Sequence, residues 1–286
     1  MTRLETITTI AALRQRLARE RAAGRRIGLV PTMGALHEGH LALVDEARAH
    51  ADLVVMSIFV NPRQFGPSED FTRYPRNLAH DTALAEARGV QVLFAPEVSE
   101  MYGGDEIRIV PGAAAARWEG EFRAGHFEGV LTIVAKLFNI VQPDVAVFGQ
   151  KDIQQVVLVR RMIEELDFPI ALRVLPIVRE RDGLARSSRN VYLSPEERQS
   201  ALALSQALRA VEAAFEAGET DAARLAAAAR RVLEAAPGVV VDYIAVADPD
   251  RLAPVTEADA GTVVALAARV GATRLIDNVI LGDEDV

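Results

Sequence analysis

The sequence predicts an α/β protein with a Rossmann-like parallel sheet followed by a smaller C-terminal α+β domain. Up to about residue 180, short apolar runs typical of strands alternate with segments of helical periodicity, which indicates a parallel sheet covered by helices on both faces. Beyond that point, two long Ala-rich helical segments precede three strand-like runs. The 286 residues suffice for about two domains. We expect these at residues 1–182 and 183–286, with the boundary in Arg181-Asp-Gly183.

The elements of the first domain follow from apolar periodicity and from residues that begin and end helices. The first helix is expected to end at Gly24 and to carry four apolar residues on one face: Ile7, Ile10, Leu13 and Leu17. Asn77 and Gly89 are the expected ends of a later helix. The remaining expected helices cover residues 38–50, 129–141 and 152–166. The expected strands cover residues 27–30, 53–60, 90–94 and 145–148.

The second domain is expected to begin with helices and to end with strands. Ser194-Pro-Glu-Glu197 has the residues of a capping box with proline at the first helical position, so a long helix should start there. A second helix is expected over residues 221–236, and strands over residues 239–246, 262–267 and 274–281. The Ala-rich segments are strong helix formers and not disordered low-complexity sequence.

Composition excludes several classes of protein. The chain has no cysteine, which excludes disulfide frameworks, Cys-ligated metal centres and thiol nucleophiles. Its formal net charge of −8 argues against bulk attraction to nucleic acid or to an anionic membrane. No apolar run is long enough to span a bilayer, and the N-terminus lacks the apolar region of a signal peptide. We therefore expect a cytoplasmic protein.

The basic residues are unusual because only two of the 32 are lysine, Lys136 and Lys151. The simplest explanation is a coding bias toward arginine. A lysine that remains in such a chain is a candidate for a task that a planar guanidinium cannot perform. Lys136 lies within a helical pattern and is expected to pack its stem along the apolar surface, whereas Lys151 follows a strand.

The densest motif is Pro31-Thr-Met-Gly-Ala-Leu-His-Glu-Gly-His40, which lies between a strand and a helix. The N-terminus of a helix at the carboxyl end of a parallel strand attracts phosphate groups. His37 and His40 share a face of the first helical turn and could bind the phosphates of a nucleotide. Two alternatives are a zinc site, for which the His-Glu-Gly-His spacing is one residue too short, and simple helix capping. Neither a P-loop nor a G-x-G-x-x-G motif is present.

Three further segments carry candidate polar groups. Phe148-Gly-Gln-Lys-Asp152 ends a later strand, where Lys151 could contact phosphate and Asp152 could either accept from ribose hydroxyls or cap a helix. Arg186-Ser-Ser-Arg-Asn190 has the composition of a mobile anion-binding loop. Asn61 and Gln64 offer neutral amides for an uncharged polar group. They precede a polar segment, residues 66–76, that could act as a lid.

In this order, the segments resemble the pantoate–β-alanine ligase (pantothenate synthetase) family. The matching strings are PTMGALHEGH, SIFVNPRQFG, HFEGVLTIVAKLFN, FGQKDIQQ and RSSRN. The resemblance extends over essentially the whole chain. That family belongs to a nucleotidylyltransferase superfamily related to class I aminoacyl-tRNA synthetases, whose HIGH-like and KMSKS-like signatures are similar to His-Glu-Gly-His and to the Ser-rich loop.

The resemblance implies an ATP-dependent ligase that forms pantothenate, a precursor of coenzyme A, through a pantoyl adenylate. It implies His40, His37 and Lys151 as catalytic residues. Gln64 would contact pantoate and β-alanine, Gln155 would contact pantoate, and Asn61 would also line the substrate site. It implies ATP-binding residues in four segments: Met33, Gly34, Ala35, Leu36, His37, Glu38, Gly39 and His40; Gly149, Gln150, Lys151 and Asp152; Val178; and Arg186, Ser187, Ser188 and Arg189.

The resemblance also implies that Mg²⁺ travels with the ATP phosphates, with no protein ligand assigned, and that the chain forms a homodimer through its N-terminal domain. The C-terminal domain would act as a lid. Two positions depart from the family pattern, because Arg186 replaces a usually apolar residue and Ile153 a usually aromatic one. The second departure is expected to affect packing. Of the neighbours Gln154 and Gln155, only one should face the cleft, because adjacent helical residues point about 100° apart.

Two other functions remain open from the residues. One is an adenylyl- or cytidylyltransferase of the same superfamily, which would share His-x-Gly-His but would not be expected to carry the paired Gln64 and Gln155. The other is a nucleotide-sensing module that binds ATP without turnover. Pantoate-dependent release of pyrophosphate distinguishes both from the ligase.

Overall fold

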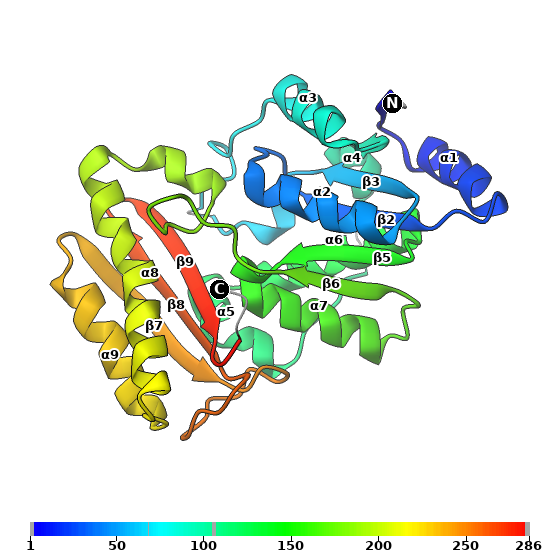
Figure 1. The fold of residues 1–286 in the computed structure, drawn as a ribbon. Helices are drawn as coiled ribbons and strands as arrows, with labels where there is room; N and C mark the ends of the chain where they lie inside the picture. The colour runs from blue at the N-terminus through cyan, green and yellow to red at the C-terminus, as the bar shows by residue number, and fades with distance from the viewer. Residues whose placement is uncertain (1–2, 68, 105–106, 284–286) are drawn as a thin grey trace. The chain divides into compact units, whose positions relative to one another are not determined.

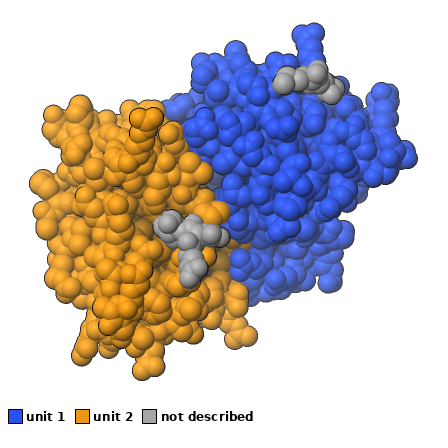
Figure 2. Space-filling model, in the orientation of Figure 1, with its two compact units in different colours: residues 1–149, 158–175 blue, residues 150–157, 176–286 orange. Residues whose placement is uncertain are grey.

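The computed structural model describes residues 3–67, 69–104 and 107–283. The chain forms two compact units (Figure 2). The first comprises Met1–Gly149 and Leu158–Leu175, and the second comprises Gln150–Val157 and Pro176–Val286. Each unit is built around its own sheet.

The first unit contains a parallel sheet of six strands in the order β1-β4-β3-β2-β5-β6 (Figure 1). The strands are β1 (Glu5–Ile7), β2 (Ile27–Thr32), β3 (Leu53–Ile58), β4 (Val92–Phe94), β5 (Val145–Gly149) and β6 (Ala171–Leu175). From β2 the chain proceeds outward through β3 and β4, and it then returns to the other side of β2 with β5. The sheet therefore has its topological switch point between β2 and β5, where sheets of this kind open a crevice at the carboxyl ends of their strands.

Helices cover both faces of this sheet. The helices are α1 (Ile10–Ala22), α2 (Glu38–His50), α3 (Leu78–Arg88), α4 (Val98–Met101), α5 (Glu119–Phe122), α6 (His126–Val141) and α7 (Ile153–Glu165). Helix α2 contacts α3, and α1 contacts α6. Two short 3₁₀ helices of this unit are η1 (Pro62–Gln64) and η2 (Ala113–Ala116), and η3 (Gln150–Asp152), directly before α7, belongs to the second unit. Buried aliphatic residues of α2, β2, β3 and β5 form the core on one face, including Val44, Val30, Val54 and Val147.

The second unit has an antiparallel sheet of three strands, in the order β7-β8-β9, against two long helices. Its elements are η4 (Ser188–Tyr192), α8 (Pro195–Glu216), α9 (Ala222–Ala235), β7 (Val239–Ala247), β8 (Val263–Val270) and β9 (Thr273–Ile280). The predicted capping box at the start of α8 is present, since Ser194 and Glu197 each accept from the other's backbone N–H. Leu204, Leu208, Leu225 and Leu266 are among the residues of its apolar core.

The structure confirms the α/β class and corrects some elements. Ile7 does not belong to the first helix, because it lies in β1 and pairs with Phe94 of β4. Thr9 then caps α1 by accepting from the N–H of Ala12. Helix α6 begins at His126, three residues before the predicted start at Gly129. Strand β6 was not predicted, because its residues are exposed or partly buried and do not form a continuous apolar run. No helix in the described part of the chain has the length and apolar content to cross a membrane.

Candidate active site

The loop between β2 and α2 is held in a tight turn by a carboxylate of α3. The buried side chain of Asp81 accepts hydrogen bonds from the backbone N–H groups of Ala35 (2.9 Å) and Leu36 (2.9 Å). Gly34 and Ala35 both have positive φ angles, of 82° and 51°. A Cβ atom on Gly34 would lie only 2.9 Å from Asp81 Oδ2, so glycine is required both by the backbone conformation and by the close approach.

Two histidines begin α2 as a reciprocal cap. His37 is the N-cap, and its Nδ1 accepts from the N–H of Gly39 at 3.1 Å. His40 Nδ1 accepts from the N–H of His37 at 3.4 Å, and the two ring centroids are 4.1 Å apart. The capping alternative from the sequence is therefore present in the structure. It is compatible with phosphate binding, because a neutral ring that accepts at Nδ1 carries its proton at Nε2, where it can donate.

Neutral amides lie at the end of the neighbouring strand β3. Asn61 and Gln64, at the start and end of η1, are both buried. Asn61 Nδ2 donates to Gln64 Oε1 at 3.1 Å, and Gln64 Nε2 donates to the thioether sulfur of Met33 at 3.0 Å. The structure thus brings three residues predicted from two separate motifs into one group.

Helix α6 packs closely against η1. A Cβ atom on Gly129 would lie 2.2 Å from the backbone oxygen of Arg63, so only glycine allows this approach. The carbonyl of Gly129 accepts from Asn61 Nδ2 at 3.1 Å. The start of α6 therefore supports the amide group directly.

A neutral histidine at the start of α6 also supports η1. His126 Nδ1 lies 2.8 Å from the backbone oxygen of Gln64, and its Nε2 lies 2.9 Å from Arg123 Nη1. Burial, followed by the charge of Arg123, lowers the pKa of His126 to about 4. The ring is accordingly neutral near pH 7, donating to the Gln64 carbonyl and accepting from the guanidinium. Arg123 is held in turn by Glu69, with two bonds of 3.0 and 2.7 Å.

In the second unit, β9 supports the segment that contains Lys151. Asn278 is buried, and its Nδ2 donates to the backbone oxygens of Gln150 and Lys151, each at 3.0 Å. Its Oδ1 accepts from Gln150 Nε2 at 3.2 Å. The side chain of Lys151 is partly exposed and lies 3.9 Å from the carboxylate of Asp152. The backbone of η3 is therefore fixed, whereas the ammonium group is not buried.

The adjacent residue of β9 supports the loop that leads to η4. Asp277 forms a two-pronged ion pair with Arg179, at 2.7 and 3.1 Å. Burial raises the pKa of the Asp277 carboxyl, and Arg179 opposes that shift. Beside Arg179, the carbonyl of Val178 accepts from the N–H of Arg186 at 2.9 Å.

The remaining predicted residues occupy the ends of elements. Ser187 caps η4 by accepting from the N–H of Arg189 at 3.2 Å, and Ser188 begins that turn. Glu38 and Gly39 lie in the first turn of α2, and Gly149 ends β5. At the start of α7, Gln154 is buried and Gln155 partly exposed. Ile153 packs against residues of β8, among them Val263 and Ala265, as expected for this departure from the family pattern.

Sequence reasoning missed the residues that hold these groups in place. Asp81, Tyr102, His126 and Asn278 are polar residues whose partners lie far away in the chain. Asn278 carried a detectable signal, because it follows Asp277 inside an otherwise strand-like run. Tyr102, whose hydroxyl donates to Asn61 Oδ1 at 2.8 Å, carried no signal.

Comparisons with known proteins show the family of the chain. The family model described as pantoate-beta-alanine ligase matches residues 5–280. Pantothenate synthetase of Acidobacterium capsulatum is 54% identical, over 99% of this chain and 98% of its own length. A crystal structure of pantothenate synthetase from Thermus thermophilus is 49% identical with a TM-score of 0.92, covering 97% of this chain and 99% of that one.

A third similar structure contains ligands. The pantoate-beta-alanine ligase from Francisella tularensis, complexed with beta-gamma ATP and beta-alanine, is 31% identical with a TM-score of 0.78 and covers 97% of each chain. The family match spans nearly the whole chain, and the curated relatives match it over nearly their whole length. This chain belongs to the pantoate–β-alanine ligase family.

Proposed function

We propose that this chain catalyses the ATP-dependent condensation of (R)-pantoate with β-alanine to pantothenate, AMP and pyrophosphate. The observation that carries the proposal is the contact between Gln64 and Met33 in the first unit. This contact joins two groups of residues. The start of α2, with His37 and His40, can bind phosphates, and the buried pair of neutral amides can bind the polar groups of a hydroxy acid. A ligase that activates a carboxylate with ATP needs both kinds of group.

The first step joins pantoate to the nucleotide. An oxygen of the pantoate carboxylate attacks the α-phosphorus of ATP, the bond to the β-phosphate oxygen breaks, and pyrophosphate leaves. His40 and His37, with N–H groups at Nε2, stabilise the charge that develops on the phosphate oxygens, and Lys151 adds a mobile positive charge. The chain has no cysteine, so no thiol of the protein carries the activated acyl group, and AMP is the proposed carrier.

The second step forms the amide. The amine of β-alanine attacks the acyl carbon of pantoyl adenylate, loses a proton and displaces AMP. Gln64 contacts both substrates and Gln155 contacts pantoate. Asn61 belongs to the substrate site through its bond to Gln64. These contributions are positioning and charge stabilisation, which suffice once the acyl group is activated.

ATP contacts are proposed for the residues that the family resemblance assigns: Met33 to His40, Gly149 to Asp152, Val178 and Arg186 to Arg189. Mg²⁺ is proposed to arrive with the ATP phosphates, since this ion is usually held by phosphate oxygens, waters and one or two carboxylates. No protein ligand is assigned to it.

Three further proposals concern the whole chain. Residues 1–182 act as the ATP- and pantoate-binding domain, and residues 183–286 act as a lid. The protein is cytoplasmic and forms a homodimer through its N-terminal domain. Two exposed apolar side chains of that domain, Ile107 (96% exposed) and Val110 (76% exposed), support the dimer as candidate contacts with a second copy.

Isotope exchange tests the proposed function. With pantoate but no β-alanine, the protein should exchange labelled pyrophosphate into ATP, and adding β-alanine should then yield pantothenate and AMP in equal amounts. Absence of pantoate-dependent exchange would overturn the proposal. If a nucleoside monophosphate in place of pantoate supports the exchange of pyrophosphate into ATP, the protein is a nucleotidyltransferase.

A further inference from the structure

Backbone groups, whose donor and acceptor roles are unambiguous, identify which end of the Asn61 amide is the oxygen and which is the nitrogen. Its Oδ1 accepts from the N–H of Arg63 at 3.2 Å, and its Nδ2 donates to the carbonyl of Gly129 at 3.1 Å. The side chain is 1% exposed, so water does not compete for these groups. The oxygen and nitrogen of this amide cannot be interchanged without breaking both bonds.

This orientation also defines the role of Tyr102. The residue directly follows α4, and its hydroxyl oxygen lies 2.8 Å from Asn61 Oδ1. An amide oxygen only accepts, so the tyrosine hydroxyl donates. Tyr102 and the N–H of Arg63 therefore hold the same oxygen from two sides.

The amide of Gln64 is oriented by Asn61. Because Asn61 Nδ2 donates to Gln64 Oε1, the oxygen of Gln64 faces Asn61 and the Nε2 group points to the other side. There it donates to the sulfur of Met33, a weak acceptor. A carboxylate or hydroxyl oxygen of a substrate accepts more strongly than this thioether, so Gln64 is preset to offer a donor.

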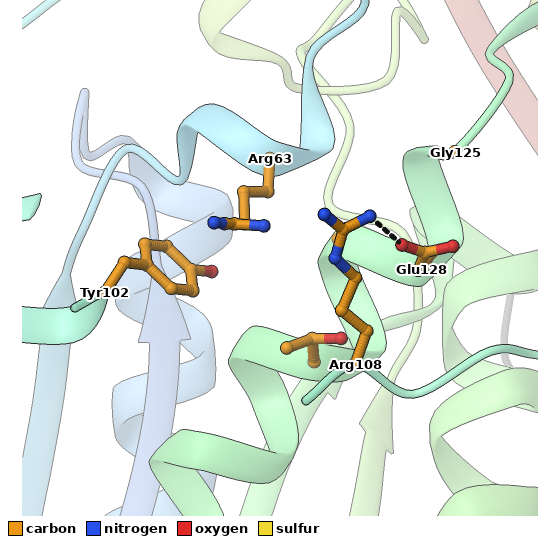
Figure 3. Close-up of a pocket in the computed structure, with 7 residues that line it drawn as sticks. Arg63, Tyr102, Arg108, Gly125 and Glu128 are labelled. Atoms are coloured by element: carbon orange, nitrogen blue, oxygen red, sulfur yellow. Dashed lines mark hydrogen bonds and ion pairs between the residues drawn. The ribbon is translucent and has the colours of Figure 1, made fainter. Parts of the chain in front are cut away.

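The ring of Tyr102 is itself held by two cations. The guanidinium carbon of Arg63 lies 4.7 Å from the ring centroid, and the ammonium of Lys136 lies 5.6 Å from it. Arg63 and Tyr102 line a cavity of about 210 Å³, which is also lined by Arg108 and Glu128, paired at 2.9 Å. Figure 3 shows the Arg63 side chain beside Tyr102. Lys136, which the sequence suggested was only packing, thus contacts the residue that orients Asn61.

We propose that Tyr102 is a positioning residue: its hydroxyl orients Asn61, Asn61 orients Gln64, and Gln64 thereby presents Nε2 as a hydrogen-bond donor to an acceptor oxygen of pantoate. This inference rests on the proposed function and deepens it. Tyr102 is not required to touch the substrate. Its effect on catalysis should pass through Gln64.

The test begins with Tyr102→Phe, which removes the donor and keeps the ring. Asn61 Oδ1 retains the N–H of Arg63, so the fold should persist. Loss of one hydrogen bond between neutral groups should lower kcat/KM for pantoate by about fivefold, while the KM for ATP should stay within about twofold of wild type. Wild-type kinetics for pantoate would overturn the proposal.

A double-mutant cycle distinguishes positioning from a general structural effect. If Tyr102 acts through Gln64, the change Tyr102→Phe should alter kcat/KM for pantoate by less than about twofold in a Gln64→Ala background. An undiminished fivefold effect in that background would contradict the proposed route. The matched control is Tyr243→Phe, since Tyr243 also has an arginine near its ring, Arg274 at 6.0 Å. It should leave kcat/KM for pantoate unchanged.

A direct measurement of the Gln64 amide does not depend on catalytic activity. The side-chain amide resonances of Gln64, identified by their absence in Gln64→Ala, should shift in the ¹⁵N–¹H spectrum of Tyr102→Phe. Unshifted Gln64 resonances would overturn the inference. The proposed function is tested separately, because a wild-type protein with no pantoate-dependent exchange would refute the function itself, whatever the variants do.

Discussion

At the scale of single residues, His37 and His40 each use one ring nitrogen to begin α2. Because Nδ1 accepts from the backbone in both, the protonated nitrogen of each neutral ring is Nε2. Helix capping and phosphate binding therefore use different atoms of the same side chain. Two interpretations that the sequence left as alternatives can both hold.

We predict that His40→Ala abolishes most of the adenylation activity but not the fold. The long hydrogen bond from the N–H of His37 should contribute at most about 1 kcal/mol to stability. Loss of a donor to the developing charge should slow pantoate-dependent pyrophosphate exchange by roughly a hundredfold. The control is His80→Ala, since His80 is exposed on α3. An unchanged exchange rate in His40→Ala would remove this residue from the mechanism.

We predict that Lys151→Arg is poorly tolerated. Asn278 holds the backbone at this position, so the substitution changes the cation and not the loop. A planar guanidinium cannot follow phosphate oxygens as a compact ammonium does, and kcat/KM for ATP should fall by roughly tenfold. The reverse change at a partly exposed arginine of α7, Arg161→Lys, should leave kcat/KM for ATP unchanged. Normal kinetics with ATP in Lys151→Arg would mean that the lysine is incidental.

At the scale of elements, the site depends on how closely α6 approaches η1. The contact places the backbone of Gly129 against that of Arg63 and lets Asn61 bond to the helix. In the second unit, β9 acts similarly, because Asp277 and Asn278 hold two predicted ATP-binding segments from successive positions of one strand. In both units, elements without predicted substrate contacts determine where the predicted site residues lie.

We predict that Gly129→Ala separates α6 from η1. A methyl group there would meet the carbonyl of Arg63 at 2.2 Å, so the backbone must shift, at a cost of about 1–3 kcal/mol in the free energy of unfolding. The KM for pantoate should rise because Asn61 and Gln64 move with η1. The control is Gly112→Ala, where no atom lies within 4 Å of the added carbon. Equal denaturation midpoints for the two variants would show that the close approach of α6 to η1 is not needed for stability.

At the scale of the whole molecule, buried His126 couples stability to pH. Its pKa is lowered from an ordinary value of 6.5 to about 4, first by burial and then by the charge of Arg123. As the pH falls from 6.5 to 4, the unfolded chain takes up this proton before the folded chain does. The contribution of His126 to the free energy of unfolding is therefore complete above pH 6.5. It decreases by roughly 3 kcal/mol in total as the pH falls from 6.5 to 4.

Urea unfolding at a series of pH values tests this coupling. Between pH 7 and pH 4.5, the free energy of unfolding should fall more steeply for the wild type than for His126→Gln. The same comparison with His80→Gln, a change at an exposed histidine, should leave the slope as in the wild type. If the free energy of unfolding depends on pH in the same way in the wild type and in His126→Gln, the lowered pKa of His126 is contradicted.

The sequence predicted the α/β class because apolar periodicity reports which faces of helices and strands are buried. It predicted the ends of α3 and the start of α8 because capping is local, as Asn77, Gly89 and Ser194 show. Ile7 was misplaced because one apolar residue beside a helix fits either a strand or the helix. The pairing of β1 with β4 places Ile7 in a strand.

The sequence by itself determined the family, the order of the strands and helices along the chain apart from β1 and β6, and the segments that carry His37, His40, Gln64 and Lys151. Only the tertiary structure decided which atom each side chain presents. Whether Gln64 offers an oxygen or an N–H depends on Asn61, which is held in turn by Tyr102, 41 positions away in the chain. A neutral His126 depends on burial and on Arg123. Hydrogen-bond roles and pKa values are set by neighbours in space, and these become neighbours only when the chain folds.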